Sequence, residues 1–396
     1  MLTALWIITV LGLVVTVVHL AMIRRWSELT LLGVVTVLGA LFVAVGMGYS
    51  ALFEAWMRED GWVEWATFFA FLLAGLLGIW RARRVDIWLV RLGILAVAIF
   101  CLFVAAEEIS WGQRLLSFKP PEIFLKHNYQ QELNLHNLLT GKRLGGFKLD
   151  SKYFVILIAL AYGVGGAALG AVLRRRDRGH EISSLMPFGA LAFGFLSVAW
   201  AELAYPIDLT GEAAELMLGM LFLADAVHKR EHSAHGFFDS GLWCNVLILG
   251  APLLVGLGVA LGTDWLLHGS ADERQMLARH ELELLAQDMR VPGSLGKRLG
   301  RKKYVHKRLF TAQEAGYLKN LEGLGFLGEK GISPRVQGRR TYFLDPWNNP
   351  YWLYYRRKSS ALVLYSFGGN RRRDSVLEKK GIVRPDDISV TISIER

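Results

Sequence analysis

The sequence predicts a polytopic α-helical membrane protein with about eight transmembrane helices and a C-terminal α+β soluble domain, a helix followed by a small antiparallel sheet. Three observations lead to this class. The 396 residues are 53% hydrophobic and only 20% charged, a balance that is unusual for soluble proteins. The apolar residues gather in runs of about 20, the length that crosses a bilayer. The excess positive charge gathers after the last run, where strand-like patterns begin.

Eight segments are apolar enough to be candidate spans. The seventh is the weakest, because it is short and carries Glu212, Glu215 and Asp225. The eight segments are 3–23, 29–52, 62–80, 87–106, 153–173, 184–204, 212–228 and 241–263.

The connections between these segments alternate in charge, and this predicts an orientation. Basic residues fall on every second connection, at 24–25, 81–84, 174–178 and 229–230, whereas the others carry mainly acids. Basic connections stay in the cytoplasm. We therefore expect a multi-pass protein of the bacterial inner membrane with both termini outside and the C-terminal domain in the periplasm. If 212–228 does not span, the C-terminal domain faces the cytoplasm, a side that the polybasic run 297–308 also favours.

The chain divides into a transmembrane domain, 1–268, with a long outer loop at 107–150, and a soluble domain, 269–396. Residues 270–396 hold 25 basic and 14 acidic side chains, whereas the rest of the chain holds 20 and 21. Cys101 and Cys244 both lie in apolar runs, so no disulfide framework is expected. We expect the lipid bilayer as a partner and, because the basic domain lies outside, no nucleic acid.

The soluble domain is predicted to begin with a helix over 272–289, whose apolar residues Met276, Leu277, Leu284 and Leu285 follow helical spacing. Pro292 and Gly293 end it. Strands are then predicted at 340–344, 351–355, 361–365 and 388–394, separated by turn-rich joints.

Three motifs of this domain resemble the C-terminal part of the major pseudopilin of type II secretion. They are Asp-Pro-Trp-Asn-Asn-Pro-Tyr at 345–351, Leu-Tyr-Ser-Phe-Gly at 364–368 and Asp-Asp-Ile at 386–388. The resemblance implies a pseudopilin-like fold and, in its acidic loop, a calcium site formed here by Asn370, Asp374, Asp386 and Asp387. Arg371–Arg373 lie within that loop and disfavour a cation. Pseudopilins have a single N-terminal helix, so the resemblance implies a shared fold rather than a shared role.

The membrane domain also resembles an uncharacterised set of bacterial multi-span proteins. The motifs are Arg-Glu-Asp-Gly at 58–61, Ala-Glu-Glu-Ile-Ser-Trp-Gly-Gln-Arg at 106–114 and Glu-Leu-Asn-Leu-His-Asn at 132–137. This resemblance implies a common membrane fold and no mechanism.

Ionisable side chains at the predicted outer face form the main candidate site, because such groups are costly at membrane depth. Glu107 or Glu108 would be the acid or base of a catalytic site that also uses His136 and Glu202. A divalent metal ion could be held by Glu108, His136, Glu202, Glu212 and Glu215, with Glu64 nearby. Two alternatives remain: a pocket for ions or protons, and ordinary acids solvated at helix ends.

A second candidate is His228, His232 and His235, which share a helix face with Asp225 and could bind zinc. The alternative is a solvated loop. Gly163, Gly165 and Gly166 lie in a predicted span, where small residues allow helices to approach closely.

Two functions follow. In the first, the basic soluble domain and the acidic outer face act together in envelope assembly or secretion, with envelope or secretion proteins as partners. In the second, the membrane domain is a metal-dependent hydrolase or transferase that acts on a lipid-linked substrate.

Overall fold

The structure is a computed structural model that describes most of the predicted spans and part of the soluble domain. The longer described stretches are 26–48, 61–116, 150–175, 180–204, 210–231, 242–268, 271–288, 351–356, 361–368 and 388–393. Shorter ones are 53, 56–57, 121, 123–124, 133–135, 138, 143–144, 147–148, 306–308 and 345–346. The chain forms two compact units, one of residues 1–111 and 139–261 and one of 112–138 and 262–396. The predicted span 3–23 lies outside the described residues.

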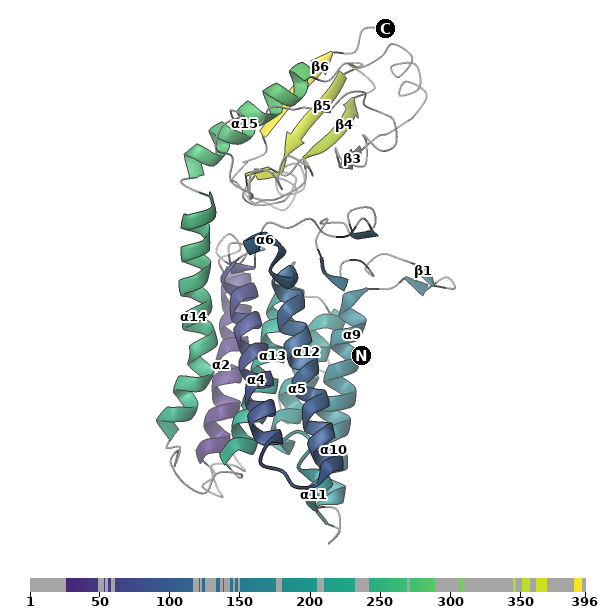
Figure 1. Cartoon of the computed structure of the whole chain (residues 1–396), viewed down its shortest axis with the longest axis vertical. Helices are drawn as coiled ribbons and strands as arrows, with labels where there is room; N and C mark the ends of the chain where they lie inside the picture. Colours follow the sequence, from purple (N-terminus) through teal and green to yellow (C-terminus); the bar gives the residue numbers. More distant parts are fainter. Residues whose placement is uncertain are drawn as a thin grey trace. The chain divides into compact units, whose positions relative to one another are not determined.

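The first unit is a helical bundle (Figure 1). Among the described residues, four helical segments are long and apolar enough to cross a membrane, so the chain has the helices of a membrane protein. These segments are Trp62–Ala82, Trp88–Glu108, Ser151–Leu173 and Val246–Thr263. The predicted count of eight is not confirmed by the described residues. The bundle helices are α2 (Trp26–Gly48), α4 (Trp62–Ala82), α5 (Trp88–Glu108), α9 (Ser151–Ile158), the π-helical η2 (Ala159–Gly166), α10 (Ala167–Leu173), α12 (Ala192–Ala204), α13 (Thr210–Glu231) and α14 (Leu242–His268).

The predicted span 184–204 is not one continuous helix. It follows the short α11 (His180–Ser183), passes through a turn that contains Pro187, and begins with a 3-10 turn, η3 (Gly189–Leu191), before α12. Proline lacks the N–H that a helix interior needs, which explains the break. The 13 residues of α12 are about 20 Å long, shorter than the hydrocarbon layer.

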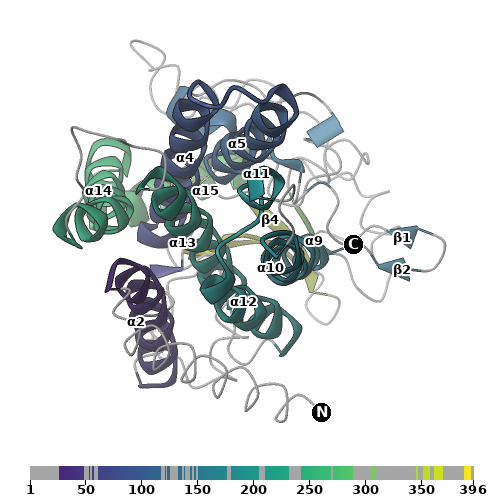
Figure 2. The ribbon, with the colours of Figure 1, turned by 90° about the horizontal axis from the view of Figure 1, so that it is seen from below.

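Helix α13, the weakest predicted span, lies in the middle of the bundle with α2, α4 and α12 around it (Figure 2). Almost every residue from Ala213 to Ala224 is buried, on all sides of the helix. A helix that is buried all round faces protein rather than lipid. This explains why α13 can be less apolar than its neighbours and can carry ionisable side chains.

Glycines set the closest helix approaches. A Cβ on Gly163 of η2 would lie 2.1 Å from Cγ of Phe195 in α12, and one on Gly166 would lie 2.9 Å from Pro187. Gly165, in contrast, faces outward and would meet only the carbonyl oxygen of Leu160 at 3.4 Å. The predicted packing role therefore holds for Gly163 and Gly166 and not for Gly165.

The second unit contains α15 (Ala271–Asp288) and an antiparallel sheet in the order β3 (His306–Arg308), β4 (Trp352–Arg356), β5 (Ala361–Ser366) and β6 (Ile388–Ser393). The helix and three of the predicted strands are confirmed, whereas 340–344 lies outside the described residues. Helix α15 buries one face, on which residues recur after three or four positions, and Met276 falls off this face and is exposed. The buried residues are Arg274, Ala278, Glu281, Leu282 and Leu285. The described residues between α5 and α9 also include η1 (Ser110–Gly112), α6 (Gln113–Leu116) and the antiparallel pair β1 (Arg143–Leu144) and β2 (Phe147–Lys148).

The motifs that resemble pseudopilin form a buried network in this unit. The hydroxyl of Ser366 donates to Asp345 and accepts the backbone N–H of Gly368, at 2.5 and 2.9 Å. Gly368 has a φ of +67°, a conformation that glycine adopts without the steric cost of a side chain. Tyr351 is fully buried and donates to Glu281 of α15. These residues thus fasten a turn and a helix to the sheet.

Candidate functional site

The predicted outer glutamates lie at helix ends that share one end of the bundle. Glu64 and Glu212 occupy the first turns of α4 and α13, whereas Glu107 and Glu108 end α5 and Glu202 lies near the end of α12. Helices α4 and α5 pack together and are joined by a short turn, so the start of one is beside the end of the other. We call Glu64, Glu107, Glu108, Glu202, Glu212 and Glu215 the acidic end.

Electrostatic interactions connect these side chains into one cluster. The carboxylate of Glu108 is repelled by the negative charges of other glutamates. Glu215 repels it most strongly, followed by Glu212, Glu64 and Glu107. The carboxylate of Glu215 is in turn repelled by those of Glu212 and Glu202. Glutamates from four different helices therefore converge, which the sequence suggested but could not establish.

Burial and helix polarity make this cluster costly. Glu202 is 2% exposed and Glu107 is 6% exposed. The C-terminal end of a helix carries a partial negative charge, so Glu107, Glu108 and Glu202 sit where the helix dipole disfavours a carboxylate. The positive charge of Lys152 attracts the carboxylate of Glu202, whereas the negative charges of Asp150 and Glu212 repel it. The cluster as a whole favours protons or an added cation.

A strained turn follows directly after Glu108. Ser110, Trp111 and Gly112 have φ values of 47°, 56° and 76°, a left-handed conformation that bulky residues rarely adopt. This turn brings the indole Nε1 of Trp111 to within 2.6 Å of Oε1 of Glu107, to which it donates, while Phe103 packs edge-on against the Trp111 ring. The strained backbone thus holds one carboxylate of the cluster in place.

Several predicted residues cannot be placed at this cluster. His136 lies outside the described residues, and so do Asn370, Asp374, Asp386 and Asp387 of the predicted calcium loop. Within the described part of the chain, no three His, Cys, Asp or Glu side chains are arranged to hold a metal ion. Of the histidine group, only His228 is described; it stacks on Phe188, with ring centroids 4.3 Å apart.

The opposite end of the bundle carries a second polar site, of which the sequence singled out only Asp225, as a companion of the predicted histidine group. Asp225 of α13 is 3% exposed and accepts three hydrogen bonds, from the Tyr162 hydroxyl at 3.0 Å, the Phe188 N–H at 2.9 Å and the Lys229 ammonium. Lys229 also donates to the carbonyl of Leu185 at 3.2 Å. Nη2 of Arg81 donates to the carbonyl of Ser184 at 3.1 Å. We call Arg81, Tyr162, Asp225 and Lys229 the basic-end network.

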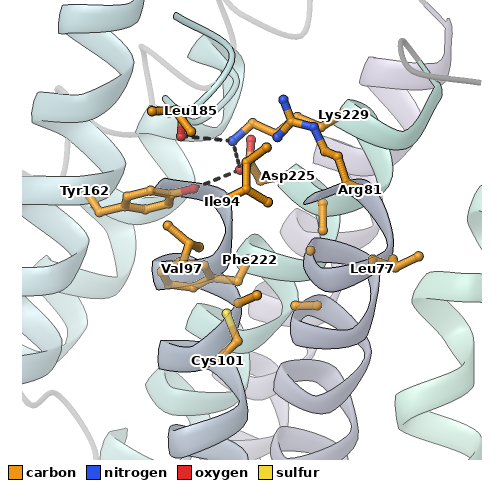
Figure 3. A pocket seen from close by; sticks show the side chains of 14 residues that line it. Leu77, Arg81, Ile94, Val97, Cys101, Tyr162, Leu185, Phe222, Asp225 and Lys229 are labelled. Atoms are coloured by element: carbon orange, nitrogen blue, oxygen red, sulfur yellow. Dashed lines mark hydrogen bonds and ion pairs between the residues drawn. The ribbon is translucent and has the colours of Figure 1, made fainter. Parts of the chain in front are cut away.

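A cavity of about 40 Å³ lies beside this network (Figure 3). Arg81, Tyr162, Asp225 and Lys229 contribute its polar walls, and the apolar side is closed by residues such as Phe222. Phe222 contacts Phe71, Phe100, Tyr162 and Phe195, so an aromatic layer lies between the cavity and the acidic end. A water molecule needs roughly 10–15 Å³ by the same measure, so the cavity has room for a small polar group.

One sequence signal could have led to this network. Asp225 and Lys229 are four residues apart within an otherwise apolar helix, which is the spacing of an ion pair on one helix face. Tyr162 gave no signal, because it lies 63 residues away and reaches Asp225 from a π-helical stretch, a feature that often occurs at functional sites.

Comparison of the chain with protein-family models, with curated proteins and with solved structures gives no match.

Proposed function

We propose that the protein is a multi-pass membrane protein that binds a cation at its acidic end and serves envelope assembly or secretion through its basic α+β domain. The observation that carries this proposal is the convergence of glutamates from α4, α5, α12 and α13, each acted on by its neighbours' charge. No three of the described carboxylates are arranged around one position, so the cation would be held by one or two of them. Even so, it would relieve part of their mutual repulsion without protonating them. The bacterial inner membrane and a periplasmic soluble domain remain part of the proposal, and they rest on the alternating charges of the connections.

The experiment is a cation titration of the full chain purified in a neutral detergent, read by thermal unfolding. Mg²⁺, Ca²⁺, Zn²⁺ and Na⁺ are each added after treatment with a chelator. A cation that binds only the folded protein stabilises it by about 2.7 kcal/mol at 100 times its dissociation constant. We expect at least one of these cations to raise the melting temperature.

Matched variants locate the effect. Glu108→Gln should abolish the cation-dependent rise, whereas Asp86→Asn, an exposed acid in the connection between α4 and α5, should keep it. A variant with Asp386→Asn and Asp387→Asn removes two ligands of the predicted calcium loop. A calcium effect that persists in this variant does not come from that loop of the soluble domain. If none of these cations changes the melting temperature of the wild type, this function is ruled out.

A second candidate is the membrane-embedded hydrolase or transferase for a lipid-linked substrate. The strained Ser110–Gly112 turn favours it, because such strain gathers at active sites, and here it positions Glu107 beside Glu108. In this function Glu107 or Glu108 is the acid or base, with Glu202 and His136 as supporting groups. Glu108→Gln would then abolish turnover of a lipid-linked phosphate or glycan by membranes that contain the protein. Equal turnover by this variant and the wild type would exclude the catalytic function.

A further inference from the structure

The cavity at the basic-end network has an excess of positive charge. Among the described residues of its lining, Arg81 and Lys229 are the cations and Asp225 is the anion, so positive charges exceed negative charges by one. Arg174 lies close enough to act electrostatically on Lys229 and adds to this excess. A confined polar space with surplus positive charge favours an anion.

Arg81 has hydrogen-bonding capacity that the described residues do not use. The residue is 9% exposed, and its Nε has no hydrogen-bond partner among the described atoms, although its Nη2 donates to the carbonyl of Ser184. A buried donor without a partner is costly unless a water molecule or a ligand accepts its proton. The planar guanidinium matches the oxygens of a phosphate group.

We propose that this cavity binds a phosphate group, with Arg81 and Lys229 as the groups that contact it. Arg81 donates from Nε to one oxygen, and the Lys229 ammonium supplies charge at close range. Asp225 stays in place because Tyr162 and Phe188 donate to it, and its role is to orient Lys229. The cavity's volume of about 40 Å³ is several times what one water molecule needs by the same measure, so a group of this size has room there.

The phosphate has two possible sources, a lipid headgroup or free inorganic phosphate. The cavity lies at the arginine-rich end of a bundle of membrane-spanning length, where headgroups meet the protein. Neither source involves the acidic end, so this inference stands or falls apart from the proposed cation site.

The test uses the full chain in a neutral detergent and measures thermal unfolding against added ligand. One arm adds inorganic phosphate. The other adds phosphatidic acid to the micelles, with diacylglycerol of the same acyl chains as the control without a phosphate. Arg81→Gln is compared with Arg83→Gln, which removes an exposed arginine two residues further along the chain.

We expect wild type and Arg83→Gln to be stabilised equally, and the apparent affinity of Arg81→Gln to fall at least tenfold. Stabilisation by inorganic phosphate identifies the free ion, and stabilisation by phosphatidic acid alone identifies the headgroup. If Arg81→Gln does not fold, Arg81→Lys takes its place. This variant keeps the positive charge but loses the planar set of guanidinium N–H donors, so it must bind several-fold more weakly than the wild type. The proposal is overturned by no response in either arm, by an equal loss in Arg83→Gln, or by wild-type affinity in Arg81→Lys.

Discussion

The two ends of the bundle deal with buried charge in opposite ways. At the basic end, one buried carboxylate receives a hydroxyl, a backbone N–H and an ammonium, so Asp225 is satisfied by the protein itself. At the acidic end, the groups that act on Glu108 are other carboxylates. The hydrogen bonds to Asp225 stabilise the packing of the helices, whereas the repulsion between glutamates destabilises the acidic end. A costly cluster of this kind is where an outside ligand would add most stability.

The same helix contributes to both ends. Helix α13 carries Glu212 and Glu215 near its start and Asp225 and Lys229 near its end, with apolar residues between them. Because the two groups of charges are separated by the aromatic layer around Phe222, variants at one end should act independently of variants at the other. This independence allows each end to be tested by substitution.

The largest effect is expected from Asp225→Asn. The change leaves Lys229 and Arg81 as buried cations without the carboxylate of Asp225, and removing one partner of a buried ion pair costs about 3–5 kcal/mol. The free energy of unfolding, measured by denaturant titration in detergent, should fall by this amount. In the double variant Asp225→Asn, Lys229→Met, part of the loss should be recovered, because the ammonium is removed together with its carboxylate. A double variant less stable than Asp225→Asn would contradict the ion-pair explanation.

The sequence predicts the individual helices and strands far better than the contacts between them. The predicted span 62–80 and helix α4 agree within two residues, because unbroken apolar runs and the Trp62 start are local features. The burial of α13 was not predictable in this way, since its low hydropathy reflects protein neighbours that only the fold brings together. The Tyr162 contact also depends on a π-helical turn, which no local pattern indicates.

The acidic end was predictable to a greater degree. The alternating charge of the connections predicts that its residues lie at one face, because helices of similar length return the chain to the same end. What the sequence could not supply is which acids are close to each other. Glu215 acts on Glu108 most strongly, and the two are 107 residues apart in the chain.

An intermediate effect is expected from Gly163→Ala, which tests how the basic end is assembled. The new methyl group would clash with Phe195, a fully buried ring, and overpacking of this kind costs about 1–3 kcal/mol. The clash should also shift Tyr162, its neighbour in η2, away from Asp225. Gly165→Ala is the matched control, because its methyl group meets no side chain. Equal unfolding free energies for the two variants would show that the close approach of η2 and α12 is not needed.

The smallest effect, and the only one of opposite sign, is expected from Glu202→Gln. Glutamine keeps the size and the polar atoms of the side chain but removes one negative charge from a crowded group, so the cation-free protein should gain about 1 kcal/mol of unfolding free energy. A buried carboxylate with its own donors would lose stability under the same change, as expected for Asp225→Asn. The comparison must be made in chelator, because a bound cation would reverse the sign by making the carboxylate favourable. If Glu202→Gln is destabilising without any cation, the acidic end is satisfied internally, as Asp225 is, and the argument for an outside cation fails.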